Sequence, residues 1–250
     1  MHAIVLDTET TSLAKPFCYD VGYAIVNMDS LDIVKTSHYV IEQVWHNLPL
    51  FESAYYKEKR PLYVQAMRAR RAILEKWGYV MQALARDIKA YDVHDVYAYN
   101  SNFDDGVFSF NCDWFKTINP LENVAIHDIW GYSSCFITNS QEYLSFCEEH
   151  NRYTDTGNYS GSAESVYQYI SNDFEFVEDH NGVSDAIIEA RILSYCIECG
   201  AEWATDYEVK KVLPRKKFED FSIVIDGETV YKGKYWKKYV RNNVYKFTTK

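Results

Sequence analysis

The chain has 250 residues, 47% of them hydrophobic, and a formal net charge of −10 at pH 7. This length allows one domain with a sizeable core and room for an appendage, and no apolar run is long enough to cross a membrane. The six cysteines are scattered, which is typical of reduced core thiols in a reducing compartment. A first strand that begins at residue 3 leaves no room for a signal peptide, so we expect a cytoplasmic protein.

Hydrophobic patterns in the first part of the chain predict a sheet followed by a long helix. Three strands near residues 3–7, 21–28 and 35–43 suggest an antiparallel meander. After an irregular stretch, Pro61 is well placed to open a helix that runs towards the next strand. The apolar face of this expected helix comprises Val64, Met67, Ile73, Leu74, Trp77 and Leu84.

The second part of the chain alternates strand patterns with helix patterns, which indicates an α/β fold. The expected elements are strands near 95–99 and 124–126, helices near 106–117, 163–171 and 186–195, and a polar loop at 151–162.

Two carboxylates stand at the end of the first expected strand, where the apolar run from Ala3 leads into Asp7 and Glu9. Because side chains alternate between the faces of a strand, both acids point the same way and are close enough to share a cation. Like charges this near repel unless a positive group neutralises them, and Mg²⁺ or Mn²⁺ can do so. Acidic residues also end strands as turn formers, so this pair alone leaves both interpretations open.

Two further segments place acids next to expected elements. The strand near 95–99 leads into a turn that puts Asp104 at its carboxyl edge, with Asp105 beside it as a rival ligand. Further on, His180 would lie on the loop before a helix, and Asp185 would lie in the first helical turn, facing it.

The motifs Asp7-x-Glu9, Asn100-x-x-x-Asp104 and His180-x-x-x-x-Asp185, in this order, resemble those of the DEDDh family of 3′→5′ exonucleases. The family includes the proofreading subunit of bacterial DNA polymerase III and RNase T. Residues 7–13 and 19–26 are also similar to the family's opening motif and second strand. The resemblance implies a ribonuclease-H-like fold, with a mixed five-stranded sheet flanked by helices and a metal site at the strand ends.

Phosphodiester cleavage explains why these residue types occur together. Two divalent metal ions can activate a water and stabilise charge on the attacking and leaving oxygens. Four carboxylates can hold such a pair, and oxygen ligands favour Mg²⁺ or Mn²⁺. A histidine, with an ordinary pKa of about 6.5, can take the water's proton near neutral pH. The expected metal ligands and the expected base are Asp7, Glu9, Asp104 and Asp185, and His180.

The resemblance also implies contacts with substrate. Thr10 and Leu13 would contact the terminal base and sugar, because the family uses the residues just after its acidic motif in this role. Asn100 and Phe103 are further candidates, although an aromatic residue next to a metal ligand is more often packed beneath the site. Ser12 stands where the family often has glycine, which leaves substrate preference open.

The last segment of the chain differs in charge from the rest. Residues 207–250 contain 12 Lys or Arg and 5 Asp or Glu, a balance of +7, whereas residues 1–206 contain 14 and 31, a balance of −17. We therefore divide the chain into an exonuclease-like domain at 1–205 and a basic, aromatic-rich extension at 206–250. Such an extension can grip a single strand through phosphates and bases, or it can be a solvated segment that balances an acidic body.

Together these features predict a metal-dependent 3′→5′ exonuclease that releases nucleoside 5′-monophosphates from the 3′ end of single-stranded DNA or RNA. The expected setting is the cytoplasm of a bacterial cell or of the host of a bacterial virus, with no membrane partner. A homodimer and an association with a polymerase both stay open. Two alternative functions also stay open: a nuclease for short oligoribonucleotides or other small phosphodiesters, and a noncatalytic nucleic-acid-binding module.

Overall fold

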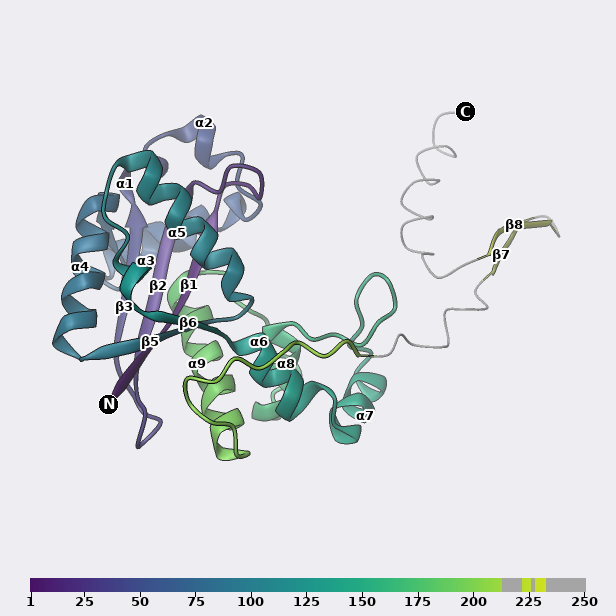
Figure 1. Ribbon diagram of the computed structural model, residues 1–250. Helices are drawn as coiled ribbons and strands as arrows, with labels where there is room; N and C mark the ends of the chain where they lie inside the picture. Colours follow the sequence, from purple (N-terminus) through teal and green to yellow (C-terminus); the bar gives the residue numbers. More distant parts are fainter. Residues whose placement is uncertain (213–221, 226–227, 233–250) are drawn as a thin grey trace, which may run out of the picture.

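A six-stranded mixed sheet, in the order β4-β3-β2-β1-β5-β6, forms the centre of the molecule (Figure 1). The computed structural model describes residues 1–212, 222–225 and 228–232. The strands of the central sheet are β1 (His2–Thr10), β2 (Cys18–Asn27), β3 (Ile33–Ile41), β4 (Ile73–Glu75), β5 (Val93–Ala98) and β6 (Ala125–Asp128). A separate antiparallel pair consists of β7 (Ser222–Ile225) and β8 (Glu228–Lys232).

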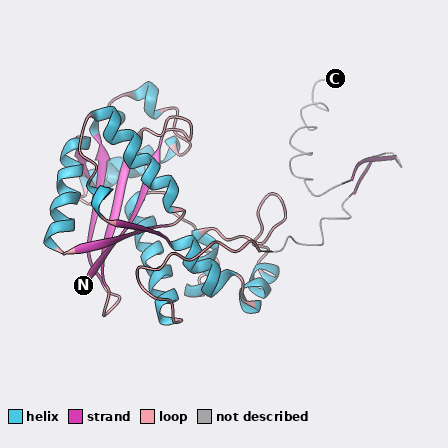
Figure 2. Ribbon diagram, in the orientation of Figure 1, coloured by secondary structure: helices cyan, strands magenta, loops and turns pink. Residues whose placement is uncertain are grey.

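Helices lie on both sides of the central strands, as Figure 2 shows. The α-helices are α1 (Glu42–Trp45), α2 (Leu48–Phe51), α3 (Arg60–Arg68), α4 (Trp77–Ala90), α5 (Ser101–Phe115), α6 (Ile129–Ser133), α7 (Gln141–Glu149), α8 (Ala163–Ser171) and α9 (Gly182–Glu198). Three short turns of other helix types are η1 (Lys57–Lys59), η2 (Pro120–Asn123) and η3 (Ser134–Thr138).

The side chains of β1 alternate between two buried cores. Ile4 and Leu6 belong to the core that also contains residues of α4 and α5, whereas Ala3 and Val5 belong to the core that contains residues of α9. Because both faces are covered, the sheet is the middle layer of an α/β sandwich. The row that begins at Ala3 and Val5 continues along the α9 face of the strand.

The predicted meander is confirmed, since β2 pairs antiparallel with both β1 and β3. β5 pairs in parallel with β1, and β6 in parallel with β5. The carboxyl ends of these three strands therefore meet at one edge of the sheet. Residues that follow β5 are brought beside the end of β1, where the first acidic motif lies.

The long helix expected from Pro61 is wrong, because the segment forms two helices with a strand between them. α3 ends at Arg68, and Arg70 adopts a left-handed φ of 57° that breaks the helix. β4 then pairs in parallel with β3 and adds a sixth strand to the expected five. The apolar Ile73 and Leu74 fit a strand as well as a helix, since so short a run has no decisive period.

Two other helices begin earlier than their apolar periodicity predicts, whereas α8 matches the predicted range of 163–171. α5 begins at Ser101 and α9 at Gly182, so each takes polar loop residues into its first turn. The consequence is functional, because Asp104 and Asp185 both stand in a first helical turn.

The first residues after 205 pack against the body of the molecule. The ring of Tyr207 meets Tyr132 of α6 edge-on, with the centroids 4.7 Å apart, and the Lys210 N–H donates to Ser134 Oγ at 2.6 Å. Beyond residue 212, the predicted basic extension lies outside the described residues apart from β7 and β8. In the described ranges, every helix is too short or too polar to cross a membrane.

Candidate active site

Asp7 and Glu9 extend the row of β1 side chains that faces α9. Val5 precedes them at the two-residue spacing and is fully buried in the core on that side. Both acids are half-buried, and Asp7 lies opposite Gly22 of β2. The strand therefore replaces apolar residues with acids where this row reaches the edge of the sheet.

Asp104 approaches the same place from the first turn of α5. Asn100 adopts a left-handed φ of 64° directly after β5, and this turn sends the chain into the helix. The side chain of Asp104 is 3% exposed, and its Oδ1 accepts a hydrogen bond from Thr8 Oγ1 at 2.7 Å. The neighbouring Asp105 is exposed, so the structure brings Asp104 rather than its rival to β1.

Asp185 reaches the site because two glycines let α9 touch the sheet. A Cβ on Gly22 would lie only 1.9 Å from the carbonyl carbon of Gly182, so this approach requires glycine. The Gly182 N–H then donates to Oδ2 of Asp20 at 2.9 Å, which fixes the first residue of the helix. Asp185, one turn later, is 7% exposed.

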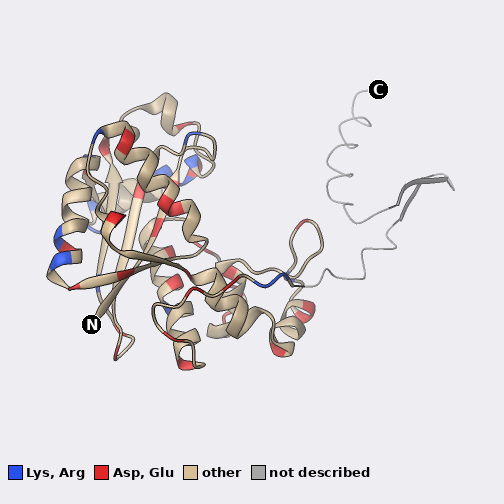
Figure 3. Ribbon diagram, in the orientation of Figure 1, with Lys and Arg blue, Asp and Glu red and all other residues tan. Residues whose placement is uncertain are grey.

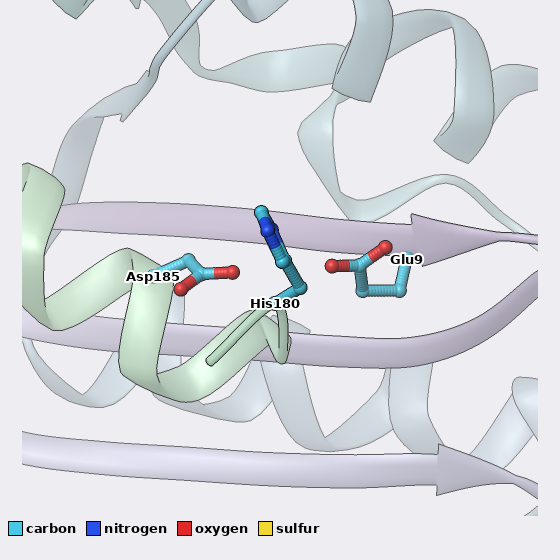
Figure 4. A group of neighbouring side chains, drawn as sticks. All are labelled: Glu9, His180 and Asp185. Carbon is cyan, nitrogen blue, oxygen red and sulfur yellow. The ribbon is translucent and has the colours of Figure 1, made fainter. Parts of the chain in front are cut away.

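His180 lies on the loop before α9 and faces two of the acids. Figure 4 shows its imidazole between the carboxylates of Glu9 and Asp185. One nitrogen of His180 and one oxygen of each of these acids all lie within 4.8 Å of one another. The loop thus brings His180 to Asp185, as the sequence spacing predicts.

Two side chains from the segment before α3 hold this loop, and we call Tyr56 and Lys59 the His180 clasp. The ring of Tyr56 stacks on the imidazole of His180, with centroids 4.1 Å apart and an interplanar angle of 11°. Lys59 Nζ donates to the carbonyl oxygen of Asp179 at 2.6 Å. His180 has a φ of 49°, an uncommon conformation for a residue other than glycine or asparagine, so the clasp stabilises backbone that is otherwise unfavourable.

The clasp could not be predicted from the sequence, because its residues lie in a stretch without strand or helix periodicity. Tyr55 and Tyr56 are adjacent in the sequence, yet Tyr55 is 83% exposed and only Tyr56 stacks on His180. No local signal distinguishes the two rings, since the contact depends on how the loop before α9 folds back.

Burial and mutual repulsion raise the pKa of the strand acids. Burial is the largest cause for Asp7, followed by the charges of Glu189 and Asp104, and together they hold its pKa well above the usual range. Burial, and then the charge of Asp20, raises the pKa of Glu9 to about 9. The ionised forms of Asp7 and Glu9 are therefore disfavoured unless a positive partner binds beside them.

The pKa values of the two acids in first helical turns, Asp104 and Asp185, are raised as well. Burial raises the pKa of Asp104 to about 7, although the hydrogen bond from Thr8 acts in the opposite direction. Burial, followed by the charge of Glu178, raises the pKa of Asp185 to about 8. All four carboxyl groups thus favour protons, or another positive charge, near neutral pH.

Glu189 is a fifth acid at the site, and it was not among the residues expected from the sequence. It is 4% exposed and accepts a hydrogen bond from the Tyr99 N–H at 3.2 Å, and its charge is the largest cause after burial of the raised pKa of Asp7. The signal that could have found it is its spacing, because Asp185 and Glu189 are four residues apart and share one face of α9.

The donor set fits a divalent cation that prefers oxygen ligands. Asp185 Oδ1 is buried and has no hydrogen-bond partner within the described part of the chain. Lys59 lowers the pKa of Glu9 and of Asp185, but it forms no ion pair with either. Carboxylates that lack hydrogen-bond donors and repel one another are the ligands that Mg²⁺ or Mn²⁺ takes in proteins.

The environment of His180 favours its neutral form. Burial is the larger cause and the positive charge of Lys59 the next, and both lower its pKa from the ordinary 6.5. A neutral imidazole at pH 7 has a free lone pair and can accept a proton.

The other four candidate residues differ in exposure. Leu13, on the loop between β1 and β2, is 85% exposed, and Asn100 is also exposed. Thr10 is half-buried at the end of β1, whereas Phe103 packs against the core on the α4 and α5 side. Leu13 and Asn100 are therefore the most open of the four to a ligand.

Comparison with known proteins supports the fold. Neither a protein-family model nor a curated protein sequence matches the chain. The nuclease domain of 3'hExo, a DEDDh family member bound to rAMP, matches with a TM-score of 0.56 at 11% identity, over 85% of this chain and 97% of that one.

Two further solved structures agree. A 3′-exonuclease described for 3′-end recognition of the histone mRNA stem-loop matches with a TM-score of 0.53 at 11% identity, over 86% of this chain and 74% of its own. A full-length 3′-exonuclease matches with a TM-score of 0.53 at 12% identity, over 93% of this chain and 69% of its own. The chain therefore has the fold of DEDDh 3′-exonucleases, which confirms the α/β, ribonuclease-H-like expectation.

Proposed function

We propose that this protein is a metal-dependent 3′→5′ exonuclease that hydrolyses single-stranded DNA or RNA and releases nucleoside 5′-monophosphates. The observation that carries the proposal is the convergence of acids from β1, α5 and α9 with His180 at one edge of the sheet. Buried acids that repel one another cost stability, and such a cost is typical of a functional site.

We assign the binding of two divalent ions, Mg²⁺ or Mn²⁺, to Asp7, Glu9, Asp104 and Asp185. When bound, the ions would stabilise the negative charge that develops on the attacking and leaving oxygens. Support comes from the raised pKa values, since the acids favour a positive partner over mutual repulsion. The charge of Glu189 also raises the pKa of Asp7, which adds to the preference of the site for a positive partner.

His180 is the proposed general base. Hydrolysis adds water across the terminal phosphodiester: the water oxygen bonds to phosphorus, the bond from phosphorus to the 3′-oxygen breaks, and that oxygen leaves with a proton. The lowered pKa of His180 keeps it ready to accept the proton that the attacking water loses. The clasp holds its ring over Glu9 and Asp185, so little reorganisation is needed at the moment of transfer.

We assign contact with the 3′-terminal nucleotide to the open end of the site. Leu13 follows β1 and is exposed, Asn100 is exposed in the turn before α5, and Thr10 follows Glu9 on β1. Phe103 has a supporting role in this assignment, because its ring packs against the core rather than facing the solvent.

The test is time-resolved cleavage of 5′-labelled single-stranded DNA and RNA of equal sequence, with Mg²⁺, with Mn²⁺ and with a chelator. We expect a metal-dependent ladder that shortens from the 3′ end and is lost in Asp7→Ala and His180→Ala. Cleavage of dinucleotides alone would favour the short-oligoribonucleotide alternative. Binding without cleavage under any metal would favour the noncatalytic module and overturn the proposal.

A further inference from the structure

A pocket of about 220 Å³ lies between α3 and the loop that carries His180. Its position follows from the register of the sheet, where Asp7 lies opposite Gly22 and Gly22 lies opposite His38. Gly182, the first residue of α9, packs against Gly22, which lies between Asp7 and His38 in the sheet. The acids therefore lie on one side of the start of α9 and the pocket, with His38 in its wall, lies on the other.

Two cations in the pocket wall lack a carboxylate partner. Lys59 and Arg71 both line the pocket, and neither forms an ion pair within the described part of the chain. The single acid in the lining, Asp179, accepts a hydrogen bond from Ser184 Oγ at 3.4 Å. His38 Nε2 lies 2.9 Å from Asp20 Oδ1, so any positive charge on His38 is paired with Asp20. The pocket lining thus carries two cationic side chains, Lys59 and Arg71, against one carboxylate, that of Asp179.

The segment that carries Lys59 and Arg71, residues 57–76, is the most basic part of the described body. Figure 3 shows acidic residues spread over most elements and few basic ones. Residues 57–76 contain 7 of the 14 Lys or Arg found in residues 1–206, with only 2 Asp or Glu. In a body with a balance of −17, this segment is where a polyanion meets attraction rather than repulsion.

Part of the remaining pocket wall is apolar, and Gln65, Asn181 and Ser184 add polar side chains to it. Leu62 is 50% exposed, and Ala66 and Val183 complete this side. Cations next to an apolar surface match the chemistry of a nucleotide. Its phosphate is attracted by the cations, and its sugar and base have apolar faces that can pack against the apolar wall.

We propose that this pocket holds one internal nucleotide of the substrate strand, with its phosphate between Lys59 and Arg71 and its base against Leu62 and Ala66. The inference rests on the proposed function, because it concerns the strand whose 3′ end reaches the carboxylates. It gives the exonuclease a second anchoring point across the His180 loop, so a strand that occupies the pocket also approaches the residues of the clasp.

The test is the binding of a fluorescent single strand of about 12 nucleotides to the full-length protein in chelator, where no cleavage interferes. Arg71→Gln removes the exposed cation, and Leu62→Glu places a negative charge at the apolar wall. Arg86→Gln, an exposed substitution on α4 away from the pocket, is the matched control. Circular dichroism confirms that each variant is folded.

We expect Arg71→Gln to weaken binding about tenfold and to lower the slope of log affinity against log salt by about one. Leu62→Glu should weaken binding at least as much, Arg71→Lys should restore most of it, and Arg86→Gln should stay within about twofold of the unchanged protein. Unchanged affinity and salt slope in Arg71→Gln and Leu62→Glu would overturn the pocket assignment.

A second arm distinguishes the strand from a free nucleotide. If Arg71→Gln weakens the binding of a 5′-mononucleotide but not of the strand, the pocket takes a free nucleotide and the proposal is wrong. Failure of the protein to cleave with Mg²⁺ would contradict the proposed function, whereas the binding result in chelator stands independently of it.

Discussion

Two kinds of buried carboxylate occur in this molecule, and their surroundings are opposite. Asp20 of β2 accepts hydrogen bonds from the Tyr63 hydroxyl at 2.8 Å and from the Gly182 N–H at 2.9 Å. Asp87 of α4 accepts one from the Tyr23 hydroxyl at 2.7 Å and lies 2.6 Å from Lys35 Nζ. These acids are partnered by the fold itself, as buried charges ordinarily are.

The acids beside His180 have few donors and several like-charged neighbours. The pKa of Asp7 is held high by burial first, and then by Glu189, Asp104, Glu9 and Asp185. The partnered acids therefore join elements together, whereas the acids beside His180 keep their binding capacity for a positive ligand that binds after folding.

The largest effects should come from substituting one unpartnered and one partnered acid, because the first change should lower kcat and the second should lower stability. We expect Asp7→Asn to lower kcat at least about a thousandfold, since a ligand for the ions is lost, while stability in chelator is kept or improved. Asp87→Asn should cost about 2–4 kcal/mol of stability, because Lys35 loses its partner, with kcat within about twofold. Urea unfolding and single-turnover cleavage measure the two quantities, and a kcat loss of equal size in both variants would remove the distinction.

The glycine contact that brings α9 to the acids can be tested with a matched pair. In Gly22→Ala the new Cβ would meet the backbone of Gly182 at 1.9 Å, so the helix must shift and carry Asp185 with it. We expect a loss of about 1–3 kcal/mol in stability and about a hundredfold in kcat. Gly106→Ala on α5 meets no atom within 4 Å and should leave kcat unchanged and stability equal or higher. Equal kcat in the two variants would show that the close approach does not position the site.

The clasp predicts a smaller effect that depends on His180. Tyr56→Leu removes the stacked ring, and we expect kcat to fall about tenfold with KM within about twofold. In a His180→Ala background the same change should have no further effect, because the clasp acts through the histidine. Tyr79→Leu, at a ring that is 56% exposed on α4, is the control. Additive losses in the double variant would mean that Tyr56 acts elsewhere.

The stability of the metal-free protein should depend on pH in a stated direction. The folded pKa values of Glu9, about 9, and Asp185, about 8, are raised above ordinary values near 4. Such a group makes its whole contribution to the free energy of unfolding below its pKa in the unfolded chain. It loses that contribution as the pH rises through its pKa in the folded protein. In chelator, Tm should therefore fall between about pH 5 and pH 9, and Mg²⁺ should reduce the fall. A Tm that rises with pH in chelator would contradict the raised values.

Much of the fold and of the site could be predicted from the sequence, and the reasons are local. Alternation along β1 placed Asp7 and Glu9 on one face, the turn after the next strand placed Asp104 at its carboxyl edge, and helix-start signals placed Asp185 in a first helical turn. Each of these inferences needs only neighbours in the chain. The meander of β1, β2 and β3 followed in the same way from strand patterns and a turn.

What the sequence analysis missed depends on contacts between distant segments. β4 is three residues long, and only its pairing with β3 distinguishes it from a helix turn. Tyr56 stacks on a residue more than a hundred positions away, and the pocket forms where α3 meets the His180 loop. Such features have no period, and they appear only once the chain has folded.

Calorimetric titration of Mn²⁺ into the metal-free protein at pH 7, in two buffers of different ionisation enthalpy, tests most directly whether the acids exchange protons for cations. We expect binding accompanied by proton release, because Glu9 and Asp185, with pKa values of about 9 and about 8, hold protons in the metal-free state. Asp185→Asn should bind more weakly and release fewer protons. Absence of binding, or binding without proton release and unchanged in Asp185→Asn, would contradict a cation site at these residues.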